Sequence, residues 1–168
     1  IDWRPILVGG VFNTVNREVY SARANPNPRR AAYTRKDLMD WARLYDLKIG
    51  WPEVFPVNSV KAMRGALVAL DAGRLVPYAR AVFRRYWGEL ADISQPHVIA
   101  DIARETGFDA DDFLRRIDEP AIRERLRRNT DELIERGGYG TPTMFVNGSD
   151  MYFGNDRLVL VDAALSRV

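Results

Sequence analysis

The spacing of hydrophobic residues changes twice along this chain. Residues 4–8 form a short apolar run that ends at Gly9 and Gly10, which predicts a buried strand followed by a flexible loop. Residues 13–30, "NTVNREVYSARANPNPRR", are polar and rich in Asn, Arg and Pro, which indicates a long loop. A loop of this length in a compact domain is more often functional or mobile than structural.

The middle of the chain has a helical period. Apolar residues three and four positions apart predict a series of helices, with starts near Thr34, Ser59, Val76, Ser94, Phe113 and Pro120. Glycines are expected to end several of them, at positions 73, 88, 107 and 137. Ser94 is expected to cap the helix that has Pro96 in its first turn. The apolar stripes, including Val76, Ala79, Phe83 and Tyr86, are expected to form the core.

After the last glycines the period changes again. Residues 143–146 and 151–153 are short and apolar, and the "NGSD" between them is a hairpin signal. Asn155 or Asp156 is expected to cap a final helix that carries Leu158 and Leu165. The order of elements predicts an α/β domain, residues 1–30 and 137–168, interrupted by an inserted helical domain at residues 31–136.

Composition narrows the possible partners. Of 168 residues, 46% are hydrophobic and 29% are charged, an ordinary balance for a globular protein. No apolar run approaches the roughly 18 residues that a membrane span needs, so no membrane partner is expected. The formal net charge is only +2, and arginine clusters such as "RLRRN" are typical of solvated helix faces. No nucleic-acid partner is expected either.

Few residues could hold a metal ion or act as a nucleophile. The chain has no cysteine, which excludes a disulfide, a thiolate metal site and a cysteine nucleophile within these residues. His97 is the single histidine, so no multi-histidine metal cluster can form. The acidic run "DADD" at residues 109–112 lacks the ligand spacing of a calcium loop and is better explained as a helix start. No metal site is predicted.

Pro142 precedes a predicted strand in "GGYGTPTMFVNGSDMYFGNDRL". Proline has no N–H, so it removes no ladder hydrogen bond at a strand start, and a Thr–Pro bond can be cis at modest cost. A cis bond there would leave the backbone N–H and C=O of Thr141 free to pair with an extended peptide. Taken alone, this pattern is a weak signal, and a simple tight turn is the better explanation of the same residues.

Three stretches of the sequence, taken together, indicate a protein family more specifically than Pro142 does alone. "YGTPTMFVNGSDMYFGNDRL", "RPILVGGVFN" and "VFPVNSVKAMRGAL" resemble the 2-hydroxychromene-2-carboxylate isomerases, relatives of kappa-class glutathione transferases and of DsbA-like oxidoreductases. The resemblance implies an α/β thioredoxin-like fold with a large inserted all-helical domain. In these families a further strand and helix carry a Ser-Pro-Tyr-like motif, with cysteine in the oxidoreductases. That unit would lie before Ile1.

The resemblance also implies a glutathione site. It places Thr141 and Pro142 against the cysteinyl part of glutathione, and Asn155 and Asp156 against its γ-glutamyl group at a helix N-terminus. The residues that map near its glycyl end are Asn16, Arg30 and Tyr33. Simple helix capping remains an alternative for Asn155 and Asp156, and solvated loop positions for the other three. Asn58 is expected either to cap a helix or to contact the substrate.

The implied reaction is a glutathione-dependent cis-trans isomerisation by reversible thiol addition to a conjugated, aromatic pyruvate-type substrate. No catalytic residue can be named within this chain, because the serine expected to hold the thiol would precede Ile1. By resemblance we expect a cytoplasmic homodimer. Two alternatives stay open: a DsbA-like thiol–disulfide oxidoreductase and a non-catalytic binding protein of the same fold. The motif before Ile1, Ser-Pro or Cys-x-x-Cys, would distinguish the isomerase from the oxidoreductase.

Overall fold

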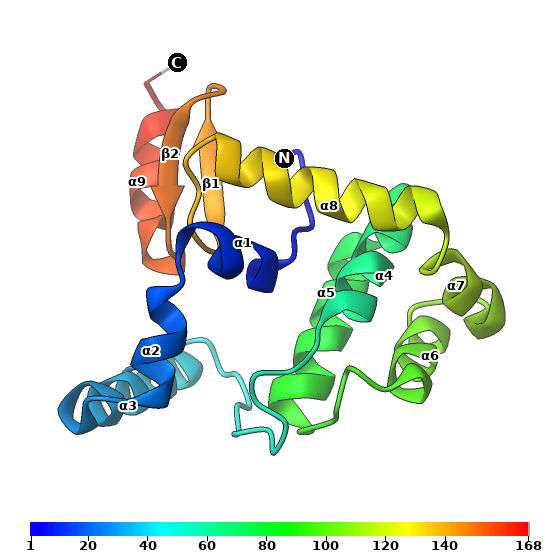
Figure 1. The fold of residues 1–168 in the computed structure, drawn as a ribbon, viewed down its shortest axis with the longest axis horizontal. Coiled ribbons are helices and arrows are strands. Elements are labelled where there is room, and N and C mark those ends of the chain that lie inside the picture. The colour runs from blue at the N-terminus through cyan, green and yellow to red at the C-terminus, as the bar shows by residue number, and fades with distance from the viewer. Residues whose placement is uncertain (168) are drawn as a thin grey trace.

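A two-stranded hairpin and a helix at the C-terminal end lie beside a group of helices from the middle of the chain (Figure 1). The structure, a computed structural model, describes residues 1–167. Its elements are α1 (Val8–Val15), α2 (Glu18–Ala24), α3 (Pro28–Leu44), α4 (Val60–Asp71), α5 (Leu75–Phe83), the π-helical turn η1 (Arg84–Gly88), α6 (Pro96–Glu105), α7 (Ala110–Arg116), α8 (Pro120–Glu135), β1 (Thr143–Val146), β2 (Asp150–Phe153), the 3₁₀ turn η2 (Asn155–Arg157) and α9 (Leu158–Leu165).

The main core lies among the helices α4 to α8. Its buried side chains come from every one of these helices, and they include Leu67, Tyr78, Ile99, Phe113 and Leu126. The Tyr78 hydroxyl donates a hydrogen bond to the Ala62 carbonyl, 3.1 Å away, which satisfies its buried polar atom. This core follows from the helical spacing of apolar residues in the sequence, as predicted.

The long helix α8 connects this core to the rest of the molecule (Figure 1). One end of α8 packs against α4, while α1 packs along it further toward the hairpin. A Cβ added at Gly10 would lie 3.1 Å from Cγ2 of Thr130, so the glycine permits α1 to approach α8 closely. The α1–α8 contact therefore joins the N-terminal segment to the helical core.

The prediction of a strand at residues 4–8 is wrong. These residues precede or begin α1, and Gly9 and Gly10 lie inside that helix. Two side chains of α8 satisfy the backbone there: the Leu7 N–H donates to Thr130 Oγ1 at 3.0 Å, and Asn129 Nδ2 donates to the Pro5 carbonyl at 3.0 Å. These two hydrogen bonds attach the segment to α8.

The prediction of a long loop at residues 13–30 is also wrong. This segment contains the end of α1, all of α2 and the first turn of α3. Asn27 caps α3, since its side chain accepts hydrogen bonds from the backbone N–H groups of Arg29 and Arg30, and Pro28 occupies the first helical position. The helix thus begins six residues before Thr34, the expected start. The expected division into residues 1–30, 31–136 and 137–168 stays a prediction.

Two details of the helical block also differ from expectation. The buried positions in α5 and η1 are Tyr78, Ala81 and Tyr86, whereas Val76 and Phe83 are exposed. Both exposed residues lie in the regular helix α5, whereas Tyr86 in the π-helical turn is buried as predicted. At α6 the cap position is Gln95 rather than Ser94, and Asp92 Oδ1 instead accepts the backbone N–H of Ser94 at 2.9 Å.

The hairpin signal is confirmed. Strands β1 and β2 pair in antiparallel register, with Thr143 opposite Phe153 and Val146 opposite Asp150. The turn places Asn147 at φ 50° and Gly148 at φ 88°, the left-handed geometry that an Asn-Gly turn adopts at little cost. The hairpin therefore follows from local sequence alone, and α9 packs against β1.

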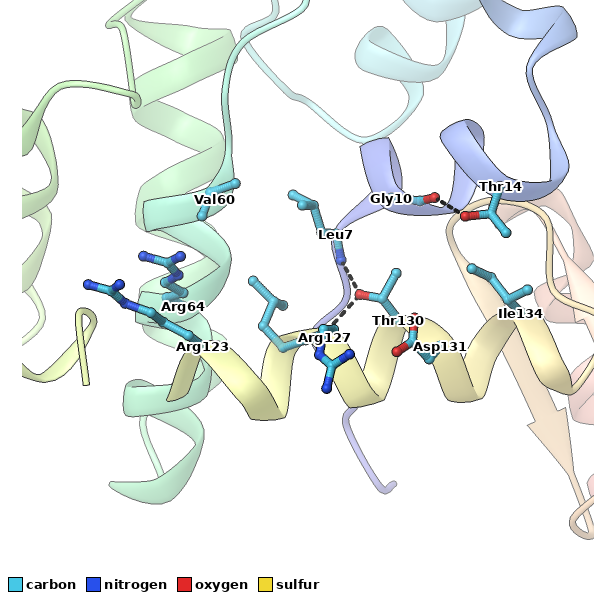
Figure 2. Close-up of a pocket in the computed structure, with 11 residues that line it drawn as sticks. Leu7, Gly10, Thr14, Val60, Arg64, Arg123, Arg127, Thr130, Asp131 and Ile134 are labelled. Carbon is cyan, nitrogen blue, oxygen red and sulfur yellow. Dashed lines mark hydrogen bonds between the residues drawn. The ribbon is translucent and has the colours of Figure 1, made fainter. Parts of the chain in front are cut away.

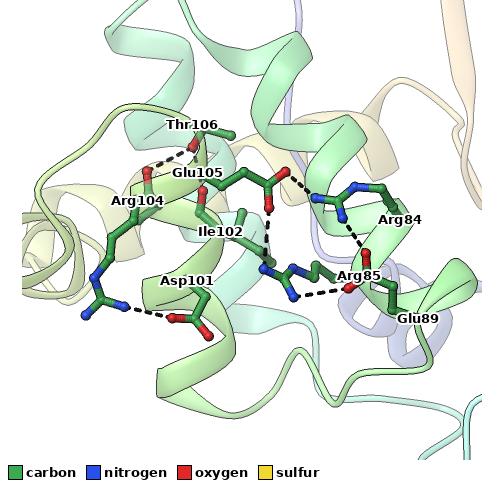
Figure 3. A network of polar contacts seen from close by, with 9 residues as sticks. Arg84, Arg85, Glu89, Asp101, Ile102, Arg104, Glu105 and Thr106 are labelled. Atoms are coloured by element: carbon green, nitrogen blue, oxygen red, sulfur yellow. Dashed lines mark hydrogen bonds and ion pairs between the residues drawn. The ribbon is translucent and has the colours of Figure 1, made fainter.

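A network of ion pairs joins η1 to α6 (Figure 3). Arg84 pairs with both Glu89 and Glu105, and Arg85 bonds to the same two carboxylates at 3.0 and 3.5 Å. These side chains are partly exposed, so each pair contributes modestly to stability. The pairs with Glu105 connect η1 to α6.

Candidate functional site

The loop before β1 leaves one residue's backbone without a partner. The Thr141–Pro142 peptide bond is cis, and both residues are exposed. The Pro142 carbonyl accepts from the Gly154 N–H at 3.0 Å, and Thr143 Oγ1 donates to the Gly140 carbonyl at 2.8 Å. Within residues 1–167, no hydrogen bond engages the N–H or C=O of Thr141. These two groups are available to a ligand in extended conformation.

Asn155 and Asp156 lie directly after Gly154, so the Gly154–Pro142 hydrogen bond places them beside this loop. The expectation that one of them caps the last helix is wrong. They form the 3₁₀ turn η2, α9 begins only at Leu158, and neither side chain makes a capping hydrogen bond. Asp156 instead pairs with Arg157 at 2.8 Å, and both Asn155 and Asp156 are exposed.

Asn16 reaches the same loop from the N-terminal part of the chain. It ends α1, and its Nδ2 donates to the Tyr139 carbonyl at 3.1 Å. The Tyr139 ring in turn packs against Phe153 of β2, with 4.5 Å between centroids. The structure therefore brings Asn16 together with Thr141, Pro142, Asn155 and Asp156.

Arg30 and Tyr33 are not brought to this group. Both belong to α3, which Figure 1 shows apart from the hairpin. Tyr33 is 66% exposed. No hydrogen bond, ion pair or aromatic contact found within residues 1–167 connects either side chain to the loop at Thr141. The resemblance placed these two residues at the site by their positions in the sequence. Helix α3, which begins earlier than expected, carries them elsewhere.

Asn58 has the polar contact of a cap and also lines a cavity. Its Oδ1 accepts the Val60 N–H at 3.1 Å, at the start of α4. The cavity beside it measures about 330 Å³ and includes Lys61, Arg64 and Ser94. Hydrogen bonds from Ser94 and Gln95 hold the pKa of the nearby Asp92 carboxyl below its usual value. Asn58 can cap α4 and line this cavity at the same time. Its two expected roles, helix cap and substrate contact, therefore both stay predictions.

A second cavity, of about 270 Å³, lies where α1, α4 and α8 meet (Figure 2). It shares Val60 and Arg64 with the first, and Thr14 of α1 lines it two residues before Asn16. The sequence analysis missed Arg64. The signal was available: "VKAMRGALVAL" is a largely apolar helix with an arginine in its middle.

Metal and membrane candidates are not found in the described part of the chain. Residues 1–167 contain no group of three or more His, Cys, Asp or Glu side chains that could hold a metal ion. His97, in the first turn of α6, is exposed. None of the helices within residues 1–167 has both the length and the apolar character that a membrane crossing requires.

Comparisons with known proteins identify relatives of this chain. A family model described as DSBA-like thioredoxin domain matches residues 1–166. A 2-hydroxychromene-2-carboxylate isomerase of Pseudomonas putida is 33% identical over 138 residues, which are 81% of this chain and 66% of that protein. Glutathione S-transferase kappa 1 of Homo sapiens is 27% identical over 176 residues, 96% of this chain and 75% of that protein. The chain thus spans slightly less than two thirds of the length of the Pseudomonas relative.

A solved structure gives the same result for the fold. The structure of a 2-hydroxychromene-2-carboxylate isomerase superposes with a TM-score of 0.81 at 28% identity, covering 99% of this chain and 80% of the other. The expected thioredoxin-like fold and the resemblance to these isomerases are confirmed.

Proposed function

Because the chain belongs to the DsbA-like thioredoxin domain family, we propose that it is a glutathione-dependent isomerase acting on an aromatic substrate with a conjugated pyruvate side chain. The observation that carries this proposal is the exposed, unpartnered backbone of Thr141 beside Asn16, Asn155 and Asp156. The names of the relatives, an isomerase and a kappa-class glutathione transferase, support the choice of ligand and reaction.

The Thr141 backbone fits the middle of a tripeptide. Its N–H and C=O would form a short antiparallel bridge with the cysteinyl residue, as an added strand does at an open sheet edge. Pro142 cannot compete for the ligand through its own carbonyl, which is engaged by Gly154. This loop would therefore orient the ligand without side-chain specificity.

The two ends of the ligand need polar side chains. Asp156 would accept hydrogen bonds from the γ-glutamyl ammonium, although this requires Arg157 to share the Asp156 carboxylate. Asn155 offers an amide to the γ-glutamyl carboxylate. Asn16 uses Nδ2 for Tyr139, which leaves its Oδ1 as an acceptor beside the loop. The group thus offers neutral and negative contacts that match the amine end of glutathione.

Bound glutathione would supply a thiol that adds reversibly to the conjugated side chain and so permits rotation about a former double bond. The residues of this chain would bind and orient the tripeptide, and the hydroxyl that holds the thiolate is expected on a serine ahead of Ile1. A hydrogen-bond donor at that position would lower the thiol pKa by stabilising the charged form.

Titration calorimetry with reduced glutathione tests the proposal. We expect binding at millimolar ligand or below, and an approximately tenfold weaker affinity for Asp156→Asn, because a charge-assisted hydrogen bond contributes about 1.5–3 kcal/mol. Asp162→Asn is the matched control, since it makes the same charge change at an exposed position of α9. It should bind glutathione as the unmodified chain does.

Two outcomes would contradict the proposal. The first is no heat of binding at millimolar glutathione in a protein with intact helical circular dichroism. The second is equal affinity for Asp156→Asn and Asp162→Asn, which would remove Asp156 from the site. The first result would favour the thiol–disulfide oxidoreductase or the non-catalytic binding protein, and the second would assign the γ-glutamyl contact to residues other than Asp156.

A further inference from the structure

The cavity between α1, α4 and α8 has a pair of arginines at one end and a mixed lining along the rest of its length. Figure 2 shows Arg64 and Arg123 at that end, Leu7 and Arg127 near the middle, and Asp131 and Ile134 toward the other end. Leu126 of α8 also lines the cavity. A cavity of about 270 Å³ with two arginines at one end and apolar side chains beside them suits a small organic acid.

The two arginines at the charged end share a single carboxylate. Arg64 Nη1 and Arg123 Nη2 both donate to Oδ1 of Asp118, at 3.0 and 3.2 Å. Two cations and one anion leave one positive charge uncompensated at this end of the cavity. A guanidinium has five N–H donors in a planar fork, so a second carboxylate can bind without displacing Asp118.

Arg64 also has a buried donor without a partner. Its side chain is only 20% exposed, and its Nε is buried and makes no hydrogen bond within residues 1–167. Arg85 Nε, in the ion-pair network of Figure 3, is likewise buried without a partner among these residues. Because Nε itself is buried, an anion in the cavity would bind the terminal nitrogens of Arg64 rather than Nε.

The neighbouring cavity adds one lysine, while the Asp92 carboxylate lies beside its Ser94. This cavity meets the first cavity at Val60 and Arg64, and it contributes Lys61 together with the neutral side chains of Asn58 and Ser94. In the first cavity Asp131 is the one acidic lining residue, and it lies beyond Arg127 along α8, away from Arg64 (Figure 2). The end of the cavity at Arg64 is therefore the one that favours an anion.

We propose that Arg64, assisted by Arg123, binds the carboxylate of an unsaturated or aromatic organic acid whose hydrocarbon part lies along Leu7 and Leu126. This deepens the proposed function, on which it rests for the identity of the acid: it assigns the substrate's carboxylate to Arg64. The hydrocarbon part would extend toward Thr14 and α1, the helix that ends at Asn16 beside the Thr141 loop. Apolar lining favours an organic acid over an inorganic anion.

Titration of the full chain with trans-cinnamate, without glutathione, tests this site. We expect saturable binding, weakened at least tenfold in Arg64→Met and less in Arg64→Lys, which keeps the charge but not the fork. Arg104→Met is the matched control, because Arg104 is an exposed arginine of α6 that pairs with Asp101 at 2.7 Å. Its affinity for cinnamate should not change.

Two further probes use the unmodified protein and do not depend on how a variant folds. Cinnamamide has the same shape without the charge, and inorganic phosphate has charge without the apolar part. Both should bind at least tenfold more weakly than cinnamate. Equal affinity for cinnamamide would overturn the role of the arginines, and equal affinity for phosphate would overturn the apolar half of the site.

The result is separable from the glutathione experiment. Cinnamate binding that depends on Arg64, in a protein that does not bind glutathione, would support this site and reject the proposed function. If glutathione binds and Arg64→Met binds cinnamate as tightly as the unmodified chain, the result would support the proposed function and reject this site.

Discussion

The helical block and the C-terminal segment bury their apolar side chains to very different extents. In α4 and α6, Leu67, Val68 and Ile99 have no exposed surface. In α9, by contrast, Leu158, Val159 and Leu160 are 56%, 71% and 49% exposed, and Ala164 is the helix's buried residue. Burial of apolar surface is the main stabilising term in folding, so the two regions cannot contribute equally to stability.

This difference explains where the candidate sites lie. The buried block provides a rigid face, formed by α4 and α8, against which the less buried segments are placed. The Thr141 loop and Asn16 belong to the less buried part, and the cavity at Arg64 lies at the junction of both. Sites on a rigid support with a more adaptable neighbour can bind ligands without loss of the core.

Paired phenylalanine truncations should produce the largest contrast. Phe113 is 1% exposed and packs on Tyr78 and Phe108, so Phe113→Ala should cost about 3–5 kcal/mol of unfolding free energy. Phe153 of β2 is 36% exposed, and Phe153→Ala should cost only about 1–2 kcal/mol. Chemical denaturation followed by circular dichroism measures both. Equal costs would mean that the helical block is not the main source of stability.

A pair of glycine substitutions sharpens the comparison within helices. A Cβ at Gly65 of α4 would overlap the Tyr78 hydroxyl and lie 2.7 Å from its Cζ, so Gly65→Ala should destabilise by about 1–3 kcal/mol. Gly9 of α1 has no atom within 4 Å of the added Cβ, and alanine is the better helix former. Gly9→Ala should therefore raise the melting temperature. A Gly65→Ala protein as stable as the unmodified chain would show that Tyr78 can move aside.

The smallest effect concerns one hydroxyl and its pH dependence. Tyr78→Phe removes the hydrogen bond to Ala62 and should cost about 1 kcal/mol at neutral pH. Burial raises the pKa of Tyr78 above its ordinary value of 10.0, so its stabilising effect is complete below pH 10 and decreases as the pH rises further. The unfolding free energies of the two proteins should converge above pH 10. A constant difference up to pH 11 would contradict this.

Much of the fold could be predicted because its signals are local. The helices from residue 60 onward follow from apolar spacing, and the hairpin follows from Asn147 and Gly148. Residues 4–8 have the composition of a strand, but the structure satisfies their polar groups through Asn129 and Thr130, more than 120 residues away. Such a long-range contact leaves no local pattern in the sequence.

The candidate site was predicted only through the family resemblance, and four of its residues are also local to one another. Thr141, Pro142, Asn155 and Asp156 are close in sequence, and one hairpin brings them together. Arg30 and Tyr33 were placed by the resemblance, and the structure puts both in α3, apart from the Thr141 loop. Arg64 and Arg123 meet only through Asp118, and no periodicity connects α4 with α8.

The sequence by itself determined the helical core, the Asn-Gly hairpin and the exposed Thr-Pro loop, because helical periodicity and turn chemistry act between neighbouring residues. Only the tertiary structure decided that residues 4–8 lie against α8 rather than in a strand. It also decided that Asn16 reaches the Thr141 loop and that an arginine in the middle of α4 faces a cavity with a buried donor unsatisfied. These outcomes depend on hydrogen bonds and packing between distant segments, which form only when the whole chain has folded.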